Sequence, residues 1–383
     1  MLGNPARSIA AAAVTATLAV PAAAESTIDW WGWAPAIETA EEYIAAFEAE
    51  HPDITINFRS IPYANYVQAL RLGLVSSAGP DVFNLEPGVI TAQFGQFAQD
   101  IEPVVEDTLG GDWAEQLSKA GVADFTVDGT LLAVPIQIGA AGQLWYNHEL
   151  HEEIGFELPS TLEQWKTACE TIEAAGKTCF VHGGKDDWVN LDAYIGIAQS
   201  VAPGKVIDAI DGEAQFTDPD LVEAFSIWKS LFDEGIMQPG ALGIAQYPDA
   251  RNQWIGGDAV FILMGTWHAN NMGERKMGQT QQSAGQDPDP FTQLAINLPD
   301  MAGRGNPSML YGGADYGLAI SKRSDDAEAA AKLVQWLGLS ESGAGLVASN
   351  TFPPALTSVA FEVPDFVNEE LQAPVAEAIS EGL

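Results

Sequence analysis

The residues best suited to chemistry in this chain are tryptophans that stand where predicted strands or turns end. Trp31 ends the first predicted strand and Trp33 follows it, and Trp188 and Trp267 stand at later turns. Ligands of open α/β sheets bind beyond the carboxyl ends of the strands. Most of the 11 tryptophans belong in a core, but we expect Trp33, Trp188 and Trp267 to face a ligand, because an indole face suits the apolar C–H patches of a pyranose ring.

Two acidic residues accompany these aromatic rings in the predicted elements. Glu86 follows a strand predicted at 81–85, and Asp315 precedes one predicted at 317–320. Carboxylates bind hydroxyl groups through charge-assisted hydrogen bonds. Aromatic plates with acidic hydrogen-bonding groups hold a neutral polyol, and the same parts hold a cation through cation–π contact. Both ligand classes stay open at this point.

Motifs that would indicate catalysis are missing. The sequence contains no Walker loop and no G-x-S-x-G motif. His148 and His151 resemble the pair on a zinc-protease helix, but they are three residues apart instead of four, which misplaces Glu149 as the base. The five histidines are otherwise scattered, so we expect no metal site, no cofactor and no catalytic residue. Acidic pairs such as Asp186 and Asp187 carry no weight for a glycosidase among 53 acidic residues.

The elements that must position these residues alternate between strand and helix in the N-terminal part. Period-two and helical patterns predict strands at 28–31, 54–58 and 81–85, with helices at 38–50 and 63–77 between them. This β-α-β-α-β order indicates a parallel sheet with helices on both faces. Further on, we expect helices at 219–232 and 325–337, a helix that begins with a Ser160–Glu163 capping box, and a surface loop at 278–290.

Two cysteines, Cys169 and Cys179, make up the whole cysteine content. Cys169 lies in a helical pattern that ends at Gly176, and Cys179 opens a predicted strand running back along that helix. In an oxidising compartment an isolated pair of this kind forms a disulfide. We therefore predict a structural Cys169–Cys179 bridge.

The first residues have the order of a secretory signal peptide. Arg7 precedes an apolar run at 9–20, and Ala22, Ala23 and Ala24 supply small residues for cleavage. The run is shorter than the roughly 20 residues that span a bilayer. We expect a signal peptide at 1–24, a mature chain that starts near Glu25 without a lipid anchor, and a location in the periplasm.

The charge limits the partners of the mature chain. Sixteen basic and 53 acidic residues give a formal net charge of −37, which repels nucleic acid and anionic lipid. No later segment has the length and apolarity of a membrane span. We therefore expect a monomer that binds no nucleic acid and does not insert into a membrane, and we attribute the charge to solubility.

Several short motifs share their order and spacing with a known family. They are Gly79-Pro80-Asp81-Val82-Phe83, Val134-Pro135-Ile136, Leu144-Trp145-Tyr146-Asn147, Pro159-Ser160-Thr161-Leu162-Glu163, Gly256-Gly257-Asp258-Ala259, Gly265-Thr266-Trp267, Leu298-Pro299 and Tyr311-Gly312-Gly313. Over nearly all of the mature chain the sequence resembles the family 1 extracellular solute-binding proteins, the group of the maltose-binding protein. Leu162 stands where that family usually has Trp.

The resemblance implies a type II periplasmic-binding-protein fold, α/β, with two lobes that each hold a mostly parallel sheet flanked by helices. Lobe I would comprise 25–136 and 294–345, and lobe II 137–293 and 346–383. A hinge between the lobes would close them around a carbohydrate ligand. The partners would then be the permease subunits of an ABC transporter.

Site residues follow from the resemblance only where motifs match. Trp267 occupies a position that often stacks on a sugar ring, and Trp33 and Glu86 follow cleft-edge strands. Gly312, Gly313 and Asp315 lie on a turn that lines the cleft in relatives, where glycine allows close backbone approach to ligand. Trp188 and Gln137 complete the predicted set, whereas Tyr146 and Asn147 are assigned to crossover packing.

One departure from the family bears on the ligand. Relatives often carry an Arg near the C-terminus, where this chain has Phe352-Pro353-Pro354-Ala355. An acidic or phosphorylated ligand would lack its bidentate partner here, which favours a neutral mono-, di- or oligosaccharide or polyol. A receptor for a cationic or amino compound and a secreted carbohydrate-active enzyme remain as alternatives.

Overall fold

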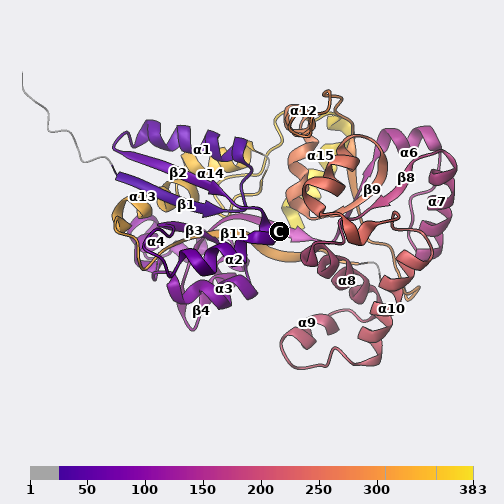
Figure 1. Cartoon of the computed structure of the whole chain (residues 1–383), viewed down its shortest axis with the longest axis horizontal. Helices are drawn as coiled ribbons and strands as arrows, with labels where there is room; N and C mark the ends of the chain where they lie inside the picture. The colour runs from indigo at the N-terminus through magenta and orange to yellow at the C-terminus, as the bar shows by residue number, and fades with distance from the viewer. Residues whose placement is uncertain (1–25, 307, 351, 383) are drawn as a thin grey trace, which may run out of the picture.

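The computed structural model describes residues 26–306, 308–350 and 352–382. The chain forms two lobes that lie side by side, each built on its own β-sheet (Figure 1). This arrangement confirms the two-lobed α/β fold predicted from the sequence. The expected signal peptide at 1–24 lies outside the described residues.

Lobe I is built on a five-stranded sheet in the order β2-β1-β3-β11-β6. Its strands are β1 (Ser26–Gly32), β2 (Ile54–Ser60), β3 (Val82–Leu85), β6 (Val134–Ala141) and β11 (Tyr311–Ile320). Its helices are α1 (Ile37–Glu50), α2 (Tyr63–Gly73), α3 (Val89–Phe94), α4 (Glu102–Leu109), α5 (Lys119–Asp124), α13 (Ala327–Leu339) and α14 (Glu341–Ser349), and a small hairpin is formed by β4 (Thr126–Val127) and β5 (Thr130–Leu131).

Lobe II is built on a four-stranded sheet in the order β10-β7-β9-β8. Its strands are β7 (Gln143–Asn147), β8 (Thr178–Val181), β9 (Ala259–Met264) and β10 (Gln293–Asn297). Its helices are α6 (His148–Ile154), α7 (Leu162–Ala174), α8 (Asp187–Val201), α9 (Lys205–Ile210), α10 (Pro219–Asp233), α11 (Arg251–Ile255), α12 (Glu274–Ser283) and α15 (Glu369–Gly382), with short helical turns η4 (Gln246–Ala250) and η5 (Thr266–Met272) beside them.

Both sheets are mixed, whereas the sequence predicted mostly parallel ones. β1 runs parallel to β2 and β3, but β11 is antiparallel to β3 and β6. In lobe II, β7 is antiparallel to β9 and β10, and β8 is parallel to β9. The strands that run against their neighbours are β11 in lobe I and β7 in lobe II, which the chain enters when it arrives from the other lobe. A strand reached in this way can enter its sheet from the end opposite to the one that a βαβ crossover would use.

The chain changes lobes at positions slightly different from those expected. β6 keeps 137–141 in the sheet of lobe I, and β10 places 293–297 in the sheet of lobe II. After α14, Ala355 and Leu356 are buried in the core of lobe I, and α15 then packs against β10. We therefore infer that the exchange points lie near Gly142, after Asn297 and beyond Leu356, instead of at 136, 294 and 346.

Several local elements differ from their predicted bounds. The cap of α7 is Thr161, whose side chain accepts a hydrogen bond from Gln164 N, so the capping box is shifted by one residue from Ser160. α12 extends to Ser283 into the expected loop at 278–290, because it buries Met277 and Gln281 on one face. α2 already ends at Gly73.

The disulfide predicted from the helix-to-strand return is present. Cys169 on α7 is bonded to Cys179 on β8, with their Cα atoms 5.0 Å apart. Both cysteines are buried in the main core of lobe II. The prediction is therefore confirmed.

Candidate functional site

The three tryptophans predicted to face a ligand lie where the two lobes meet, together with two tyrosines that were not predicted. From lobe I, Trp33 follows β1 and Tyr63 begins α2. From lobe II, Trp188 lies in the first turn of α8, Tyr247 in η4 and Trp267 in η5. We call these five residues the aromatic cluster.

Ring contacts connect the aromatic cluster across the two lobes. Trp33 contacts Tyr63 edge to face at a centroid distance of 5.5 Å, and Tyr63 meets Trp188 at 6.4 Å. Trp188 stacks on Tyr247 at 6.1 Å and 17° and contacts Trp267 at 6.1 Å. Trp267 Nε1 donates to the Tyr247 hydroxyl at 3.2 Å. The lobes are thus in contact through aromatic side chains.

Three carboxylates lie beside the aromatic cluster, and each holds one polar partner. Tyr63 OH donates to Glu86 Oε2 at 2.6 Å, and Tyr311 OH donates to Asp192 Oδ1 at 2.5 Å. Gln137 Nε2 donates to Asp315 Oδ2. Glu86 and Asp315 belong to lobe I, and Asp192 belongs to α8 of lobe II. We call Glu86, Asp192 and Asp315 the acidic trio.

The acidic trio is held in an environment that disfavours negative charge. The pKa of Glu86 is raised to about 7, mainly by burial; the hydrogen bond from Tyr63 lowers it, and the nearby carboxylates of Asp315 and Asp192 add to the rise. Burial also raises the pKa of Asp192 and of Asp315 to about 6. Among the described residues, no Lys, Arg or His forms an ion pair with these three groups. Hydroxyl or cationic groups of a ligand would stabilise the charged carboxylates and lower their pKa values.

Two glycines bring the site residues close to the backbone. A Cβ atom placed on Gly139 would lie 3.4 Å from Asp315 Cβ and 3.6 Å from Trp267 Cε3, so these two side chains flank the same point of β6. A Cβ atom on Gly265 would overlap the Trp267 ring, so this ring lies directly over the residue that follows β9. Trp145 Nε1 in turn donates to Gly265 O at 3.2 Å.

Gly312 and Gly313 allow close approach to other parts of the chain. A Cβ atom on Gly312 would overlap the backbone oxygen of Gly139 on β6, and one on Gly313 would overlap the carboxylate of Asp124. That carboxylate accepts from Ala314 N at 2.8 Å. These contacts require glycine without any ligand, and a ligand contact at either residue stays a prediction.

The structure brings together six of the eight residues predicted for the site. Trp33, Glu86, Trp188, Trp267 and Asp315 lie in or beside the aromatic cluster. Gln137 is 3% exposed and reaches Asp315, while its Oε1 atom has no hydrogen-bond partner among the described residues. Trp31 instead packs in the core of lobe I, with the Arg59 guanidinium 4.4 Å from its ring.

Sequence reasoning missed Tyr63, Asp192 and Tyr247. Asp192 follows Trp188 by four residues, and helical spacing places such a pair on one face of α8. That signal was available once a helix was assigned there. Tyr63 and Tyr247 have no comparable pattern, because their positions depend on how the two lobes meet.

No helix among the described residues is long and apolar enough to cross a bilayer.

Comparison with known proteins gives consistent results. A binding protein of Brucella abortus is 25% identical over 236 residues, which cover 61% of this chain and 56% of that protein. The Multiple sugar-binding protein of Streptococcus mutans is 25% identical over 237 residues, covering 60% of this chain and 54% of that protein. The chain thus matches just over half the length of these curated relatives.

Solved structures share the fold. The maltose-bound MalE3 of T. maritima superposes with a TM-score of 0.73 at 20% identity, covering 93% of this chain and 88% of that chain. A chitin oligosaccharide binding protein gives a TM-score of 0.71 at 19% identity, covering 90% of this chain and 82% of that chain. The family model of the bacterial extracellular solute-binding proteins matches residues 12–344, and the chain therefore belongs to this family.

Proposed function

We propose that this solute-binding protein captures a neutral saccharide or polyol between its two lobes and delivers it to the permease of an ABC importer. The observation that carries the proposal is the aromatic cluster, contributed by both lobes and bordered by the acidic trio. As a member of this family the chain is a binding protein and not an enzyme. We assign no reaction to its carboxylates.

The chemistry of the aromatic cluster suits a sugar ring. Indole and phenol faces bury the apolar C–H side of a pyranose, and carboxylates accept hydrogen bonds from its hydroxyl groups. Trp188, Trp267 and Glu86 are half-buried, so a ligand that separates the lobes slightly would reach all three. Because no Lys, Arg or His of the described chain pairs with the acidic trio, sugar hydroxyls would supply donors to it.

Relatives support both parts of the proposal. The Galactooligosaccharide-binding protein of Bacillus subtilis is 26% identical over 239 residues, and one solved relative in fold holds raffinose at 20% identity. A Pyrococcus horikoshii relative, 22% identical over 244 residues, carries the name of an ABC transporter extracellular-binding protein. Export through the signal peptide predicted at 1–24 would place the chain in the periplasm, where such a permease collects its solute.

A cationic or amino compound is the second candidate ligand, and the acidic trio favours it. Three carboxylates without an ion-pair partner lie beside aromatic rings that attract cations. A cation would lower the pKa of each carboxylate and release protons on binding. Cation affinity should therefore rise with pH between about 5 and 8, whereas a neutral sugar gains much less from that change.

Thermal unfolding against a ligand panel tests the proposal. The protein is heated with single sugars, polyols and amines at millimolar concentration. A ligand at 1,000 times its dissociation constant stabilises by about 4 kcal/mol, which is a shift of several degrees in a protein of this size. A shift with one saccharide class supports the proposal, a shift only with amines supports the second candidate, and no shift with any of them contradicts both.

A further inference from the structure

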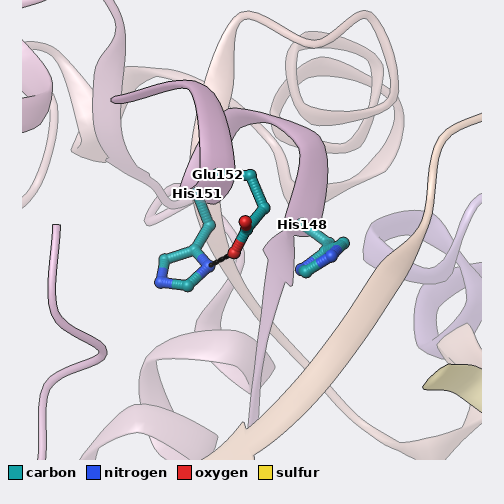
Figure 2. A group of neighbouring side chains, drawn as sticks. All are labelled: His148, His151 and Glu152. Carbon is teal, nitrogen blue, oxygen red and sulfur yellow. Dashed lines mark ion pairs between the residues drawn. The ribbon is translucent and has the colours of Figure 1, made fainter. Parts of the chain in front are cut away.

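A group of side chains of metal-ligating types lies on α6, on the side of lobe II remote from lobe I (Figure 1). His148, His151 and Glu152 each offer one ligand atom, and these atoms lie within 4.8 Å of one another. Figure 2 shows the Glu152 carboxylate directed to the space between the two imidazole rings. Their spacing of three and four residues places all three side chains on one helix face.

One ring nitrogen of each histidine in this group is buried and makes no hydrogen bond within the described part of the chain. His148 Nδ1 and His151 Nδ1 are both buried and have no hydrogen-bond partner among the described residues. His151 Nδ1 lies 3.5 Å from Glu152 Oε1, which is longer than a good hydrogen bond. Buried polar atoms without a partner are uncommon and need an explanation. A bound ion would supply one.

The start of α6 is fixed by contacts with Thr292, the residue before β10. His148 N donates to Thr292 O at 2.9 Å, and the Glu149 carboxylate accepts from Thr292 N at 2.9 and 3.0 Å. The Asn147 side chain caps the helix by accepting from Leu150 N at 3.0 Å. Glu149 is thus engaged in structure, and Glu152 is the carboxylate left for a ligand.

The ring of His151 is also held in place. It meets Phe156 edge to face at a centroid distance of 4.9 Å and Tyr146 at 5.7 Å. The His148 ring lies 6.1 Å from it. Little side-chain freedom would be lost on binding an ion, which is what a preformed site requires.

We propose that His148, His151 and Glu152 form a binding site for a divalent transition-metal ion of the Zn²⁺ type. Two imidazoles and one carboxylate suit Zn²⁺ or its borderline neighbours, whereas Mg²⁺ and Ca²⁺ prefer oxygen alone. Zn–N and Zn–O distances near 2.1 Å require the three ligand atoms to move together slightly from their present separation. Solvent would complete the coordination, since Glu152 is exposed.

From the sequence alone no metal site is expected here, because His148 and His151 lack the spacing of a zinc-protease helix. The structure adds a third metal ligand, Glu152, that the sequence motif did not include. Glu152 directly follows His151 and closes the group, and Glu149 turns to Thr292. The site contains no base positioned on the ion, so we assign it binding and not catalysis.

Zn²⁺ binding by the purified protein without a histidine tag tests this site. After chelation and removal of the chelator, Zn²⁺ is titrated calorimetrically in millimolar Mg²⁺, which occupies the acidic surface. We expect one equivalent of Zn²⁺ to bind, and the double variant His148→Gln/His151→Gln to lose at least tenfold in affinity. Co²⁺ should give visible absorption bands of low coordination number in the wild-type protein only.

Two further variants control the interpretation. Glu152→Ala changes an exposed side chain, leaves the fold intact and should also weaken Zn²⁺ binding at least tenfold. His51→Gln removes a histidine at the end of α1 in lobe I and should leave the titration unchanged. Binding that fails to saturate, or that is equal in the wild type and in the His148, His151 and Glu152 variants, would overturn the proposal.

Discussion

At the residue scale, Trp267 connects more parts of the proposed sugar site than any other predicted residue. It contacts Trp188, donates to the Tyr247 hydroxyl and lies over Gly139 near Asp315. We predict that Trp267→Ala weakens binding of the identified ligand by about 1–3 kcal/mol, from lost stacking area. Isothermal titration calorimetry measures the change.

A matched tryptophan separates this effect from general loss of stability. Trp113 is half-buried on a short turn of lobe I, outside the aromatic cluster. Trp113→Ala should bind ligand as the wild type does, even if its unfolding temperature falls. Wild-type affinity in Trp267→Ala would remove that residue from the site.

Gly265 should act on binding through Trp267. Its φ of −94° is allowed for any residue, but an added methyl group would overlap the Trp267 ring. We predict that Gly265→Ala displaces this ring and weakens ligand binding about as much as Trp267→Ala. Because both changes act on one side chain, Gly265→Ala should add little in the Trp267→Ala background. Full additivity in this double-mutant cycle would show that Gly265 acts by another route.

Sequence reasoning selects residues that lie together in space where one element decides a residue's place, and their contact with ligand stays a prediction. Trp188, Trp267 and Glu86 follow from the ends of strands and turns, and the structure places them together. Tyr63 and Tyr247 could not be predicted in the same way. Their neighbours come from the opposite lobe or from a distant turn, and no local pattern contains that information.

At the scale of elements, the bridge between α7 and β8 should be a moderate source of stability. Cys169 and Cys179 are separated by 10 residues, and closing so short a loop in the unfolded chain stabilises by about 2–3 kcal/mol. We predict that Cys169→Ala/Cys179→Ala lowers the free energy of unfolding by about this amount. Denaturant unfolding with and without reductant measures it.

Reductant provides the control for the bridge. The wild-type protein should lose stability in reductant, and the double variant should not respond. An equal loss in both proteins would point to an effect of reductant elsewhere. Unchanged stability in the double variant would show that the bridge contributes nothing.

Elements are predicted well by local pattern and less well where packing decides. The amphipathic patterns place α1, α10 and α13 close to their observed bounds. The run of Gln, Thr and Ser at 279–283 has no apolar pattern, yet it is helical because Lys276, Met277 and Gln281 are buried on one face. Strand direction is set by the path of the chain between lobes, which is why the mixed sheets were not foreseen.

At the scale of the whole molecule, the two lobes bring like charges together. Glu86 and Asp315 of lobe I lie near Asp192 of lobe II, and the Asp192 carboxylate contributes to the raised pKa of Glu86. Other polar contacts join the lobes, among them Lys276 Nζ on α12, which lies 3.3 Å from Thr39 Oγ1 and 3.9 Å from Glu42 Oε1 on α1. The carboxylates of the acidic trio therefore disfavour contact between the lobes, whereas the polar contacts between α1 and α12 favour it.

The sign of the resulting pH dependence follows from the raised pKa values. Each carboxyl of the acidic trio has a pKa raised from its ordinary value of 3.8 or 4.5 to about 6 or 7. We infer that separating the lobes hydrates these groups and returns their pKa values toward the ordinary ones, so closing takes up protons between about pH 4 and 7. For Glu86, whose pKa rises from 4.5 to about 7, the shift corresponds to at most about 3 kcal/mol. Acid should favour the closed form without ligand, and alkaline pH should favour the open form.

We predict that the ligand-free protein has a smaller radius of gyration at pH 5 than at pH 8, measured by small-angle X-ray scattering. The variant Glu86→Gln/Asp192→Asn removes two carboxylates of opposite lobes that repel each other, so its radius should change much less with pH. Addition of the identified ligand at pH 8 should compact the wild-type protein, because bound hydroxyl or cationic groups replace the missing protons as donors to the acidic trio. If the wild-type radius is the same at both pH values while the ligand still compacts it, the carboxylates bind solute without controlling closure, and the contacts of Lys276 would be the next to change.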